Sequence, residues 1–474
     1  MRAAILLLCS LSLTSAFLAP APTLLPVGRR ANVASSFGRS PLPKTPLARS
    51  ASRVGPVTMG LKRCVDNLTR EELEGKRVLL RCDLNVPITN GVISDDTRIK
   101  ESLPTIIYLL ENGAKVAVAS HLGRPEGGFD PSYSLAPVAK RLGELLGCPV
   151  PLAKDCVGEA VAEAVEQLHP EGGICMLENL RFQPGCEQND KEFAKQLAKP
   201  FDMFVNDAFG SAHRAHSSTV GVTRFLSPCV AGLLLSKELN FLDGPVKEPK
   251  RPFAAIVGGS QVSEKIDMID SLLERVDKMI IGGTMSYTFL AAQGVDVGGT
   301  YVDTEKIPAV KKLLEKAKKR KIDIVLPTDA VLAPTYKAST KRKTQSIENW
   351  PEYWIALDIG PATIKSIERE IAGCQTVLWS GPMGVYEFDK FRFGTDAVAG
   401  LLAEATKAGV ITVVSGGDTL NAIKKAGYAN QMAHISTAGA ATLELLEGNS
   451  LPGVDALDDS GRRGLRKRLL SLIK

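Results

Sequence analysis

Short apolar runs of strand length alternate with segments of helical spacing along most of this chain. A first series of runs lies at 78–81, 116–120, 174–177 and 203–205, and helical spacing appears at 99–110, 136–146, 159–168 and 191–197. A second series of runs lies at 253–257, 279–281, 322–326, 376–379 and 410–414. Such alternation is typical of parallel βαβ units. A chain of 474 residues is longer than a single hydrophobic core usually supports, so we predict an α/β protein with two domains.

Charged residues follow the apolar runs of the first half, in the segments 81–85, 120–124, 178–181 and 206–216. Ligands of open parallel sheets bind at the carboxyl ends of the strands. Arginine forms paired hydrogen bonds with carboxylate or phosphate oxygens, and three of the five histidines lie in the same segments. We therefore predict a site for a small polyanion. For any one of these residues, a solvated side chain or a turn-capping carboxylate is the simpler alternative.

Glycines follow the runs of the second half, at 258–259, 282–283, 381 and 416–417. Glycine lets the backbone approach phosphate closely, and a helix N-terminus offers free N–H groups. Asp418, directly after the last pair, is a suitable Mg²⁺ ligand because Mg²⁺ takes few carboxylates beside substrate phosphates. The P-loop and G-x-G-x-x-G signatures are both missing from the sequence. We predict a nucleotide-phosphate site, with ordinary turn glycines as the alternative.

Charge is distributed unevenly along the chain. Residues 1–60 contain seven basic residues and no acidic one, which leaves a net charge of −1 for the rest from a total of +6. Net charge therefore gives no support to nucleic-acid binding, and an aromatic content of 5% argues against base-stacking surfaces.

The N-terminus is typical of a targeting leader. Arg2 precedes an apolar stretch at 3–13 and small residues at 14–16, followed by a Ser-, Pro- and Arg-rich stretch to Met59. We predict a bipartite leader over 1–59 that consists of a signal-like segment and a transit peptide. Such a leader would direct the protein to a plastid, into the chloroplast stroma. A plain secretory signal is the alternative. No other segment is apolar enough to span a membrane, so we expect no membrane association of the mature form.

The nine cysteines form no C-x-x-C or Cys/His metal spacing. Most lie in apolar runs, so we predict buried free thiols. The stretch 231–242 has helical spacing, and we expect 243–245 together with Pro249 to end that helix.

The chain resembles the phosphoglycerate kinase family in seven ordered segments between about residues 61 and 457. These are RCDLNVP (81–87), SHLGRP (120–125), LENLRF (177–182), NDAFGSAHRAHSS (206–218), GPMGVYEF (381–388), GGDT (416–419) and LELLEG (443–448). The resemblance implies two Rossmann-like three-layer αβα domains with parallel sheets, joined by a hinge helix. It also implies a monomer that transfers a phosphoryl group directly between ATP and 3-phosphoglycerate, giving ADP and 1,3-bisphosphoglycerate, with Mg²⁺ as cofactor.

The resemblance divides the chain into an N-terminal phosphoglycerate-binding domain at 60–230, a hinge helix at 231–245 and a C-terminal nucleotide-binding domain at 246–448. The remaining segment, 449–474, is expected to return to the N-terminal domain and to end in a basic tail. Substrate would be held by seven residues: Asp83, Asn85, Arg98, His121, Arg124, Arg181 and Arg214. Nucleotide would be held by seven others: Lys265, Gly283, Glu387, Gly416, Gly417, Asp418 and Thr419.

Particular roles follow from the same resemblance. Arg98, position 261 and Gly416 would act on the transferring phosphoryl group, in keeping with chemistry in which the protein positions groups and neutralises charge. Asp418 would bind the Mg²⁺ ion, and Glu387 would contact the ribose.

The chain departs from the family pattern only in its second half. Gln261 replaces a family lysine that accompanies the transferring phosphate, and a neutral amide cannot cancel charge. Further replacements of family glycines are Thr284, Ala356, Ser415, Ala438 and Ala440. Each added Cβ is tolerable if the residue has a negative φ. Two hypotheses follow: an active plastid phosphoglycerate kinase, or a catalytically impaired homologue that binds phosphoglycerate in a regulatory or scaffolding role.

Overall fold

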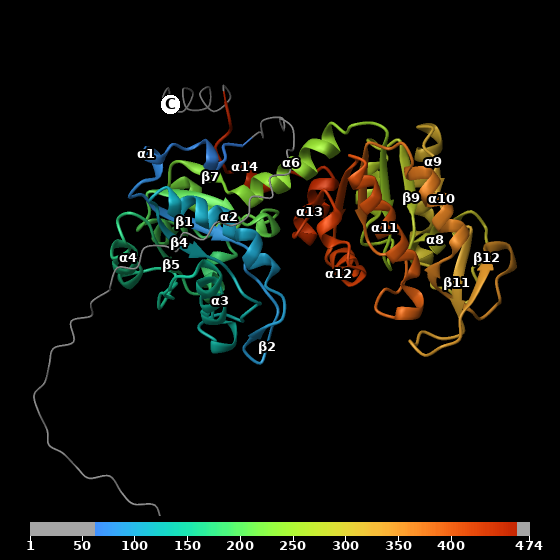
Figure 1. Ribbon diagram of the computed structural model, residues 1–474, viewed down its shortest axis with the longest axis horizontal. Helices are drawn as coiled ribbons and strands as arrows, with labels where there is room; N and C mark the ends of the chain where they lie inside the picture. The colour runs from blue at the N-terminus through green and yellow to red at the C-terminus, as the bar shows by residue number, and fades with distance from the viewer. Residues whose placement is uncertain (1–61, 462–474) are drawn as a thin grey trace, which may run out of the picture. The chain divides into compact units, whose positions relative to one another are not determined.

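The computed structural model describes residues 62–461 (Figure 1). Its first sheet has five parallel strands in the order β5-β4-β1-β6-β7. These strands are β1 (Arg77–Cys82), β4 (Lys115–Ala119), β5 (Gly173–Met176), β6 (Met203–Asp207) and β7 (Cys229–Ala231). A two-stranded hairpin, β2 (Ile88–Thr89) with β3 (Val92–Ile93), follows β1.

Helices cover both faces of this first sheet because successive strand residues point to opposite faces. In β1, Leu79 packs in one core, beside residues of α4 (Glu159–Glu166) and α5 (Lys191–Ala198). Its neighbour Leu80 packs in a second core, beside α2 (Thr97–Glu111) and α3 (Ala136–Leu146). The N-terminal half is therefore a three-layer αβα unit. The short helix α1 (Arg70–Leu73) precedes β1.

The second sheet has six parallel strands in the order β10-β9-β8-β14-β15-β16. These are β8 (Phe253–Val257), β9 (Lys278–Ile281), β10 (Ile324–Val325), β14 (Thr376–Ser380), β15 (Ile411–Ser415) and β16 (His434–Ile435). Within β14, Leu378 packs toward one core and Trp379 toward another, so this unit also has three layers. The predicted fold class, two Rossmann-like αβα units with parallel sheets, is confirmed.

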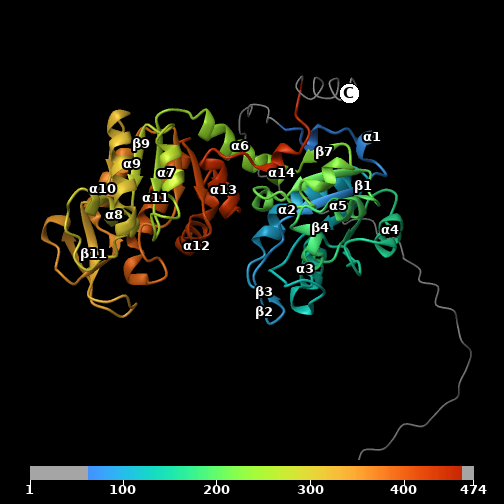
Figure 2. The same ribbon diagram turned by 180° about the vertical axis from the view of Figure 1, so that it is seen from behind.

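The helices of the second half divide between these two cores (Figure 2). On one side lie α7 (Ile266–Leu272), α8 (Met285–Ala292), α9 (Ile307–Lys319) and α13 (Gly439–Leu446). On the other lie α10 (Pro361–Ile371), α11 (Phe393–Lys407) and α12 (Gly417–Ala426). A separate antiparallel sheet, which the sequence patterns did not predict, has the order β12-β11-β13; its strands are β11 (Asp329–Ala333), β12 (Lys343–Ser346) and β13 (Ile355–Ile359).

The helix α6 (Leu233–Lys247) connects the two halves, and both of its predicted limits were wrong. Ala231 is the last residue of β7, since the run 229–231 pairs with β6. The predicted stop at 243–245 fails because Pro245 removes only one backbone N–H. The Glu248 N–H still donates to the Gly244 carbonyl at 2.8 Å, so the helical turn continues.

The last described residues pack against the first unit. Gly453, in α14 (Pro452–Asp455), donates its N–H to the Ala212 carbonyl, and the Asp458 N–H donates to the Cys229 carbonyl. Lys62 and Asp459 form an isolated antiparallel bridge. The predicted leader at 1–59 and the basic tail at 462–474 lie outside the described residues.

Two sequence predictions about composition can be compared with these residues. All eight cysteines between residues 62 and 461 are free thiols, and all are buried except the half-buried Cys148, as predicted. Across the same range, the structure holds no helix long and apolar enough to cross a membrane.

Candidate functional site

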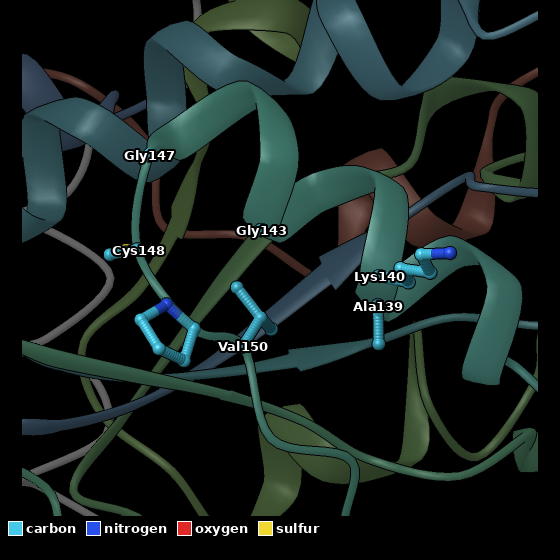
Figure 3. Close-up of a pocket in the computed structure, with 7 residues that line it drawn as sticks. Ala139, Lys140, Gly143, Gly147, Cys148 and Val150 are labelled. Atoms are coloured by element: carbon cyan, nitrogen blue, oxygen red, sulfur yellow. The ribbon is translucent and has the colours of Figure 1, made fainter.

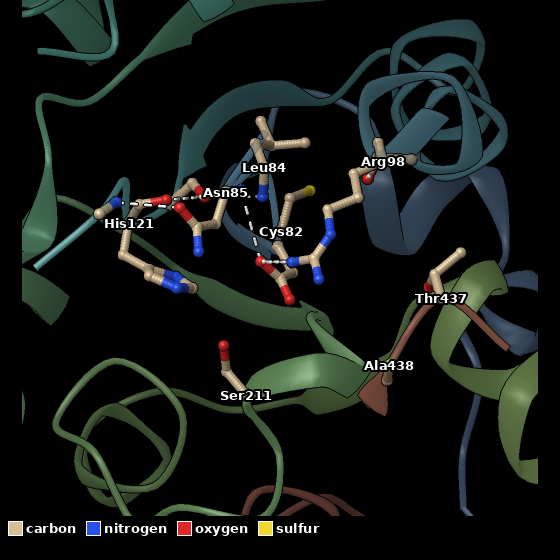
Figure 4. Close-up of polar contacts among 12 residues, drawn as sticks. Cys82, Leu84, Asn85, Arg98, His121, Ser211, Thr437 and Ala438 are labelled. Carbon is tan, nitrogen blue, oxygen red and sulfur yellow. Dashed lines mark hydrogen bonds and ion pairs between the residues drawn. The ribbon is translucent and has the colours of Figure 1, made fainter. Parts of the chain in front are cut away.

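An ion pair between Asp83 and Arg98 lies beyond the end of β1 (Figure 4). Arg98 is the second residue of α2. One Oδ of Asp83 lies 2.7 Å from the Arg98 guanidinium. Burial acts to raise the pKa of the Asp83 carboxyl, but the charges of Arg98, His121 and Arg81 outweigh it and lower that pKa. Asp83 is therefore ionised at neutral pH and orients Arg98.

The loop after β4 is tied to the neighbouring strand ends. The Asn85 side-chain oxygen accepts from the Gly123 N–H at 2.9 Å, and Arg181 donates to the Gly123 carbonyl. Arg181 also pairs with Glu187 at 2.7 Å. Gly123 has φ +60, and an added Cβ would lie 2.2 Å from the Tyr133 ring, so the turn requires glycine.

Arg81, which the sequence analysis did not select, is the most buried cation of this site. Its side chain is only 2% exposed. It donates to the Ser218 hydroxyl at 3.3 Å and to the Cys82 carbonyl, and its Nη2 lies 3.2 Å from His121 Nδ1. Burial lowers the pKa of this guanidinium. The available signal was an arginine within an otherwise apolar strand.

The three histidines add hydrogen-bonding groups, not charge. Burial lowers the pKa of His121 to about 3 and that of His216 to about 4. Burial and then the charge of Arg214 lower the pKa of His213. All three are neutral at pH 7, so the positive charge of the site comes from its arginines.

Two predicted arginines stand apart from the Asp83–Arg98 pair. Arg124 is exposed and, among residues 62–461, forms no hydrogen bond or ion pair. Arg214 is also exposed, and its Nε lies 3.3 Å from His213 Nε2. The structure therefore brings Asp83, Asn85, Arg98 and His121 together. Among residues 62–461 the Arg124 guanidinium has no hydrogen bond or ion pair, and that of Arg214 contacts the neighbouring His213.

The glycine-rich strand ends of the second sheet approach one another closely. Gly283 has φ +65, and a Cβ there would lie 2.5 Å from Gly259 N. Gly259 itself has φ +112. Only glycine therefore allows the backbones that follow β8 and β9 to come this close. The Gly259 N–H donates to the Pro382 carbonyl at 3.0 Å, which also ties the end of β8 to the loop after β14.

Lys265 lies beneath these glycines. Its ammonium group donates to the Gly258 carbonyl at 2.7 Å and to the Ser380 carbonyl at 2.9 Å, so it joins the ends of β8 and β14. Burial lowers the pKa of Lys265 to about 8, while the charges of Glu264 and Asp418 oppose this shift. The group remains mainly charged at pH 7.

The helix α12 begins at the predicted position, directly after β15. Gly416, with φ +94, precedes its first residue, Gly417. Thr419 is buried and its hydroxyl accepts from the Gly381 N–H at 2.7 Å. Asp418 is exposed and forms no hydrogen bond or ion pair among the described residues. One free carboxylate beside open helix amides suits a Mg²⁺ ion held mainly by nucleotide phosphates.

Gln261 and Glu387 are both exposed at the edge of this second site. Gln261 lies between β8 and α7, and across residues 62–461 no hydrogen bond of its side chain is found. The Glu387 carboxylate is also free there, while Lys425 holds the Glu387 backbone carbonyl at 3.1 Å.

The residues that replace family glycines are compatible with their backbone conformations. Among described residues, the non-glycine residues with positive φ are Asn90, Asn189 and Lys321. Thr284, Ala356, Ser415, Ala438 and Ala440 therefore cause no left-handed strain. Ser415 has a different cost, because its hydroxyl is buried without a hydrogen-bond partner.

Neither detected cavity lies at these strand ends. One, of about 390 Å³, lies beside α3 and is lined by Lys140, Gly143 and Cys148 among others (Figure 3). The other, of about 260 Å³, lies near the starting ends of β8 and β9, beside Arg251 and Asp277. None of the residues that line either cavity belongs to the candidate site.

Comparisons with known proteins agree with this geometry. A family model described as "Phosphoglycerate kinase" matches residues 67–449. A phosphoglycerate kinase of Picosynechococcus sp. is 54% identical over 400 residues, covering 84% of this chain and all of that protein. A chloroplastic phosphoglycerate kinase of Volvox carteri is 52% identical over 413 residues, covering 87% and 89% of the two chains.

A solved structure of phosphoglycerate kinase from Coxiella burnetii has a TM-score of 0.76 and 39% identity, and covers 83% of this chain and 98% of its own. In one αβα unit the strand ends carry cationic side chains, and in the other they carry glycines. This combination defines a two-domain phosphotransferase. The chain belongs to the phosphoglycerate kinase family.

Proposed function

We propose that the protein catalyses reversible, Mg²⁺-dependent phosphoryl transfer between ATP and 3-phosphoglycerate, giving ADP and 1,3-bisphosphoglycerate. The observation that carries the proposal is the intact cationic site around Arg98 and Asp83, together with the glycine-rich edge of the second sheet. Nothing in the comparisons supports the impaired homologue as an alternative.

The N-terminal site would bind the phosphoglycerate. Arg124, Arg181 and Arg214 offer guanidinium groups for its carboxylate and phosphate oxygens. Asn85 and His121 offer neutral hydrogen-bonding groups. Arg98, held by Asp83, would neutralise charge on the phosphoryl group during transfer.

The C-terminal site would bind the nucleotide. The open amides of Gly416 and Gly417 at the start of α12 would bind phosphate oxygens, with Lys265 and Thr419 supporting the neighbouring backbone. The Asp418 carboxylate would hold the Mg²⁺ ion, whose charge screens the phosphates. Gly283 would permit close approach of the nucleotide, and Glu387 would accept hydrogen bonds from the ribose.

The proposed division of the chain follows these two sites. A phosphoglycerate-binding domain would precede the hinge helix α6 (Leu233–Lys247), and a nucleotide-binding domain would follow it to about residue 448, with 449–461 returning to the first domain. The bonds from Gly453 and Asp458 to residues of the N-terminal half support that return. We also propose that the protein works as a monomer, since each half carries its own ligand site.

Gln261 gives the sharpest test of the proposal. Residues 60–474 should phosphorylate 3-phosphoglycerate with ATP, and Gln261→Lys should increase kcat about 10- to 100-fold, because a cation at this exposed position would cancel charge that an amide cannot. Gln261→Met is the matched control, since it preserves side-chain length without a donor.

One outcome would decide against the proposal, and a second would decide only against a role for charge at position 261. If the wild-type protein bound 3-phosphoglycerate without detectable turnover, it would not be the proposed kinase. If Gln261→Lys and wild type had equal kcat, the charge at position 261 would play no part in transfer.

A plastid location is proposed from the leader and from the chloroplastic relatives. There, ATP would be consumed to make 1,3-bisphosphoglycerate in carbon fixation. A fluorescent reporter fused to residues 1–60 should accumulate in the chloroplast stroma; secretion of that reporter would contradict the proposal.

A further inference from the structure

Lys424 links two helices through a contact with Asp95, a residue 329 positions earlier in the sequence. Its ammonium group lies 2.7 Å from an Asp95 carboxylate oxygen and 2.9 Å from the Thr97 hydroxyl oxygen. Lys424 belongs to α12, whereas Asp95 and Thr97 form the start of α2. None of these three residues belongs to the sets selected from the sequence.

Each of these helices begins at one of the two ligand sites. Arg98 directly follows Thr97 and is paired with Asp83. At the other site, Lys424 lies about one and two-thirds helical turns after Asp418, in the helix that Gly416 precedes. A single ammonium group thus connects the helix of the phosphoglycerate site with the helix of the nucleotide site.

The acceptors are themselves held in place. The other Asp95 oxygen accepts from the Thr97 N–H at 2.8 Å and from the Thr97 hydroxyl at 2.5 Å, which fixes the first turn of α2. On the α12 side, Lys425 donates to the Tyr386 and Glu387 carbonyls. Adjacent lysines of α12 therefore hold the nucleotide-side loop and the substrate-side helix.

We propose that Lys424 is a positioning residue for phosphoryl transfer: by holding Asp95 and Thr97, it fixes the distance between the N-terminus of α12 and Arg98. The inference rests on the proposed function. Transfer needs donor and acceptor within a narrow range of distance and angle, and an error of about 1 Å costs up to about a hundredfold in rate. The Lys424 and Asp95 side chains are 32% and 40% exposed, so their pairing contributes little to folding stability.

A double-mutant cycle tests the pairing. Lys424→Met should lower kcat about tenfold and leave the KM values for ATP and 3-phosphoglycerate within about twofold of wild type. Asp95→Asn keeps an acceptor oxygen for the start of α2 and should lower kcat similarly. The double variant should be no slower than either single variant, because both remove the same contact. Lys424→Arg should restore most of the rate.

Lys407→Met is the matched control, since Lys407 is an exposed, paired lysine on α11. It should leave kcat unchanged, and all the variants should unfold at the wild-type denaturant concentration. The inference is overturned if Lys424→Met keeps kcat within twofold of wild type, or if the two single effects multiply in the double variant.

Small-angle X-ray scattering separates this inference from the proposed function. With no ligand added, Lys424→Met should have a larger radius of gyration than wild type and Lys407→Met. Absence of turnover in the wild-type protein would contradict the proposed function. Equal radii of gyration for Lys424→Met and wild type would contradict the positioning role, whether or not the protein turns over.

Discussion

Ser415 and Ser436 occupy equivalent places at the ends of β15 and β16, yet their hydroxyl groups differ in bonding. Ser436 is 2% exposed and its hydroxyl bonds to the Ala438 N–H and to Thr442 Oγ1, at 3.2 and 2.8 Å. Ser415 is 1% exposed, and within residues 62–461 its hydroxyl has no hydrogen-bond partner. A buried hydroxyl without a partner loses its hydration and gains nothing in return.

Ser415→Ala should therefore raise the free energy of unfolding by about 1 kcal/mol, because it removes the unpaired hydroxyl and leaves the Cβ in place. Ser436→Ala should lower it by about 1 kcal/mol. Urea unfolding of the two variants beside wild type measures both. A loss of stability in Ser415→Ala would mean that its hydroxyl has a partner after all.

At the residue scale, the sequence was informative where charge follows a strand. Asp83 and His121 were found because their positions after apolar runs placed them at one sheet edge. Arg81 was missed since its side chain lies within the strand, where pattern alone cannot tell a buried cation from a solvated one. One of the bonds that satisfy it is to the adjacent Cys82 carbonyl, but the bond to Ser218 reaches a segment 137 positions away, which no local pattern predicts.

The start of α6 depends on a single buried carboxylate at the end of β6. Asp207 Oδ1 accepts from the Leu234 and Leu235 N–H groups at 2.9 and 3.1 Å, and its second oxygen lies buried near Thr105. Burial raises the pKa of Asp207 from 3.8 to about 6. The folded protein therefore binds a proton here more tightly than the unfolded chain does.

This shift predicts a pH dependence of stability. The stabilisation from protonated Asp207 is fully present below about pH 4 and is lost as the pH rises through about 6, a decrease of about 2–3 kcal/mol. Asp207→Asn keeps the acceptor for both amides but cannot ionise. The difference in unfolding free energy between variant and wild type should shift in favour of the variant by that amount between pH 4.5 and 7.5. A difference independent of pH would contradict the prediction.

At the element scale, α/β alternation predicted both parallel sheets, but helix limits failed where local signals conflicted with pairing. The run at 229–231 became β7 because β6 offered a free edge. The antiparallel sheet of β11, β12 and β13 escaped prediction because its middle strand is buried while β12 is largely exposed, so the two share no alternating pattern.

On the scale of the whole molecule, α6 is bonded to the second sheet through one carboxylate. Glu238 is fully buried; one of its oxygens lies 2.8 Å from His434 Nε2, and the other accepts from the Thr437 N–H at 2.9 Å. His434 also stacks on Phe241, with ring centroids 4.6 Å apart. This contact holds the chain just before α13, where Ala438 lies across from Ser211 and Arg98 (Figure 4).

Glu238→Ala should lower the free energy of unfolding by about 3 kcal/mol, since it leaves the buried His434 ring and the half-buried Thr437 N–H without their carboxylate partner. Glu238→Gln should cost less, because its amide oxygen can still accept from Thr437. Denaturant unfolding compares the two. A cost below about 1 kcal/mol for Glu238→Ala would show that water replaces the lost carboxylate.

The bridge between Lys62 and Asp459 has a consequence for synthesis of the chain. It closes nearly the whole described polypeptide into one loop, and the N-terminal unit receives part of its packing from the residues translated last. A ribosome must therefore complete almost the entire second unit before the first can become fully native. Until then, Cys229 and Ala212 lack the backbone partners that Asp458 and Gly453 supply, and the earlier half must remain soluble while incomplete.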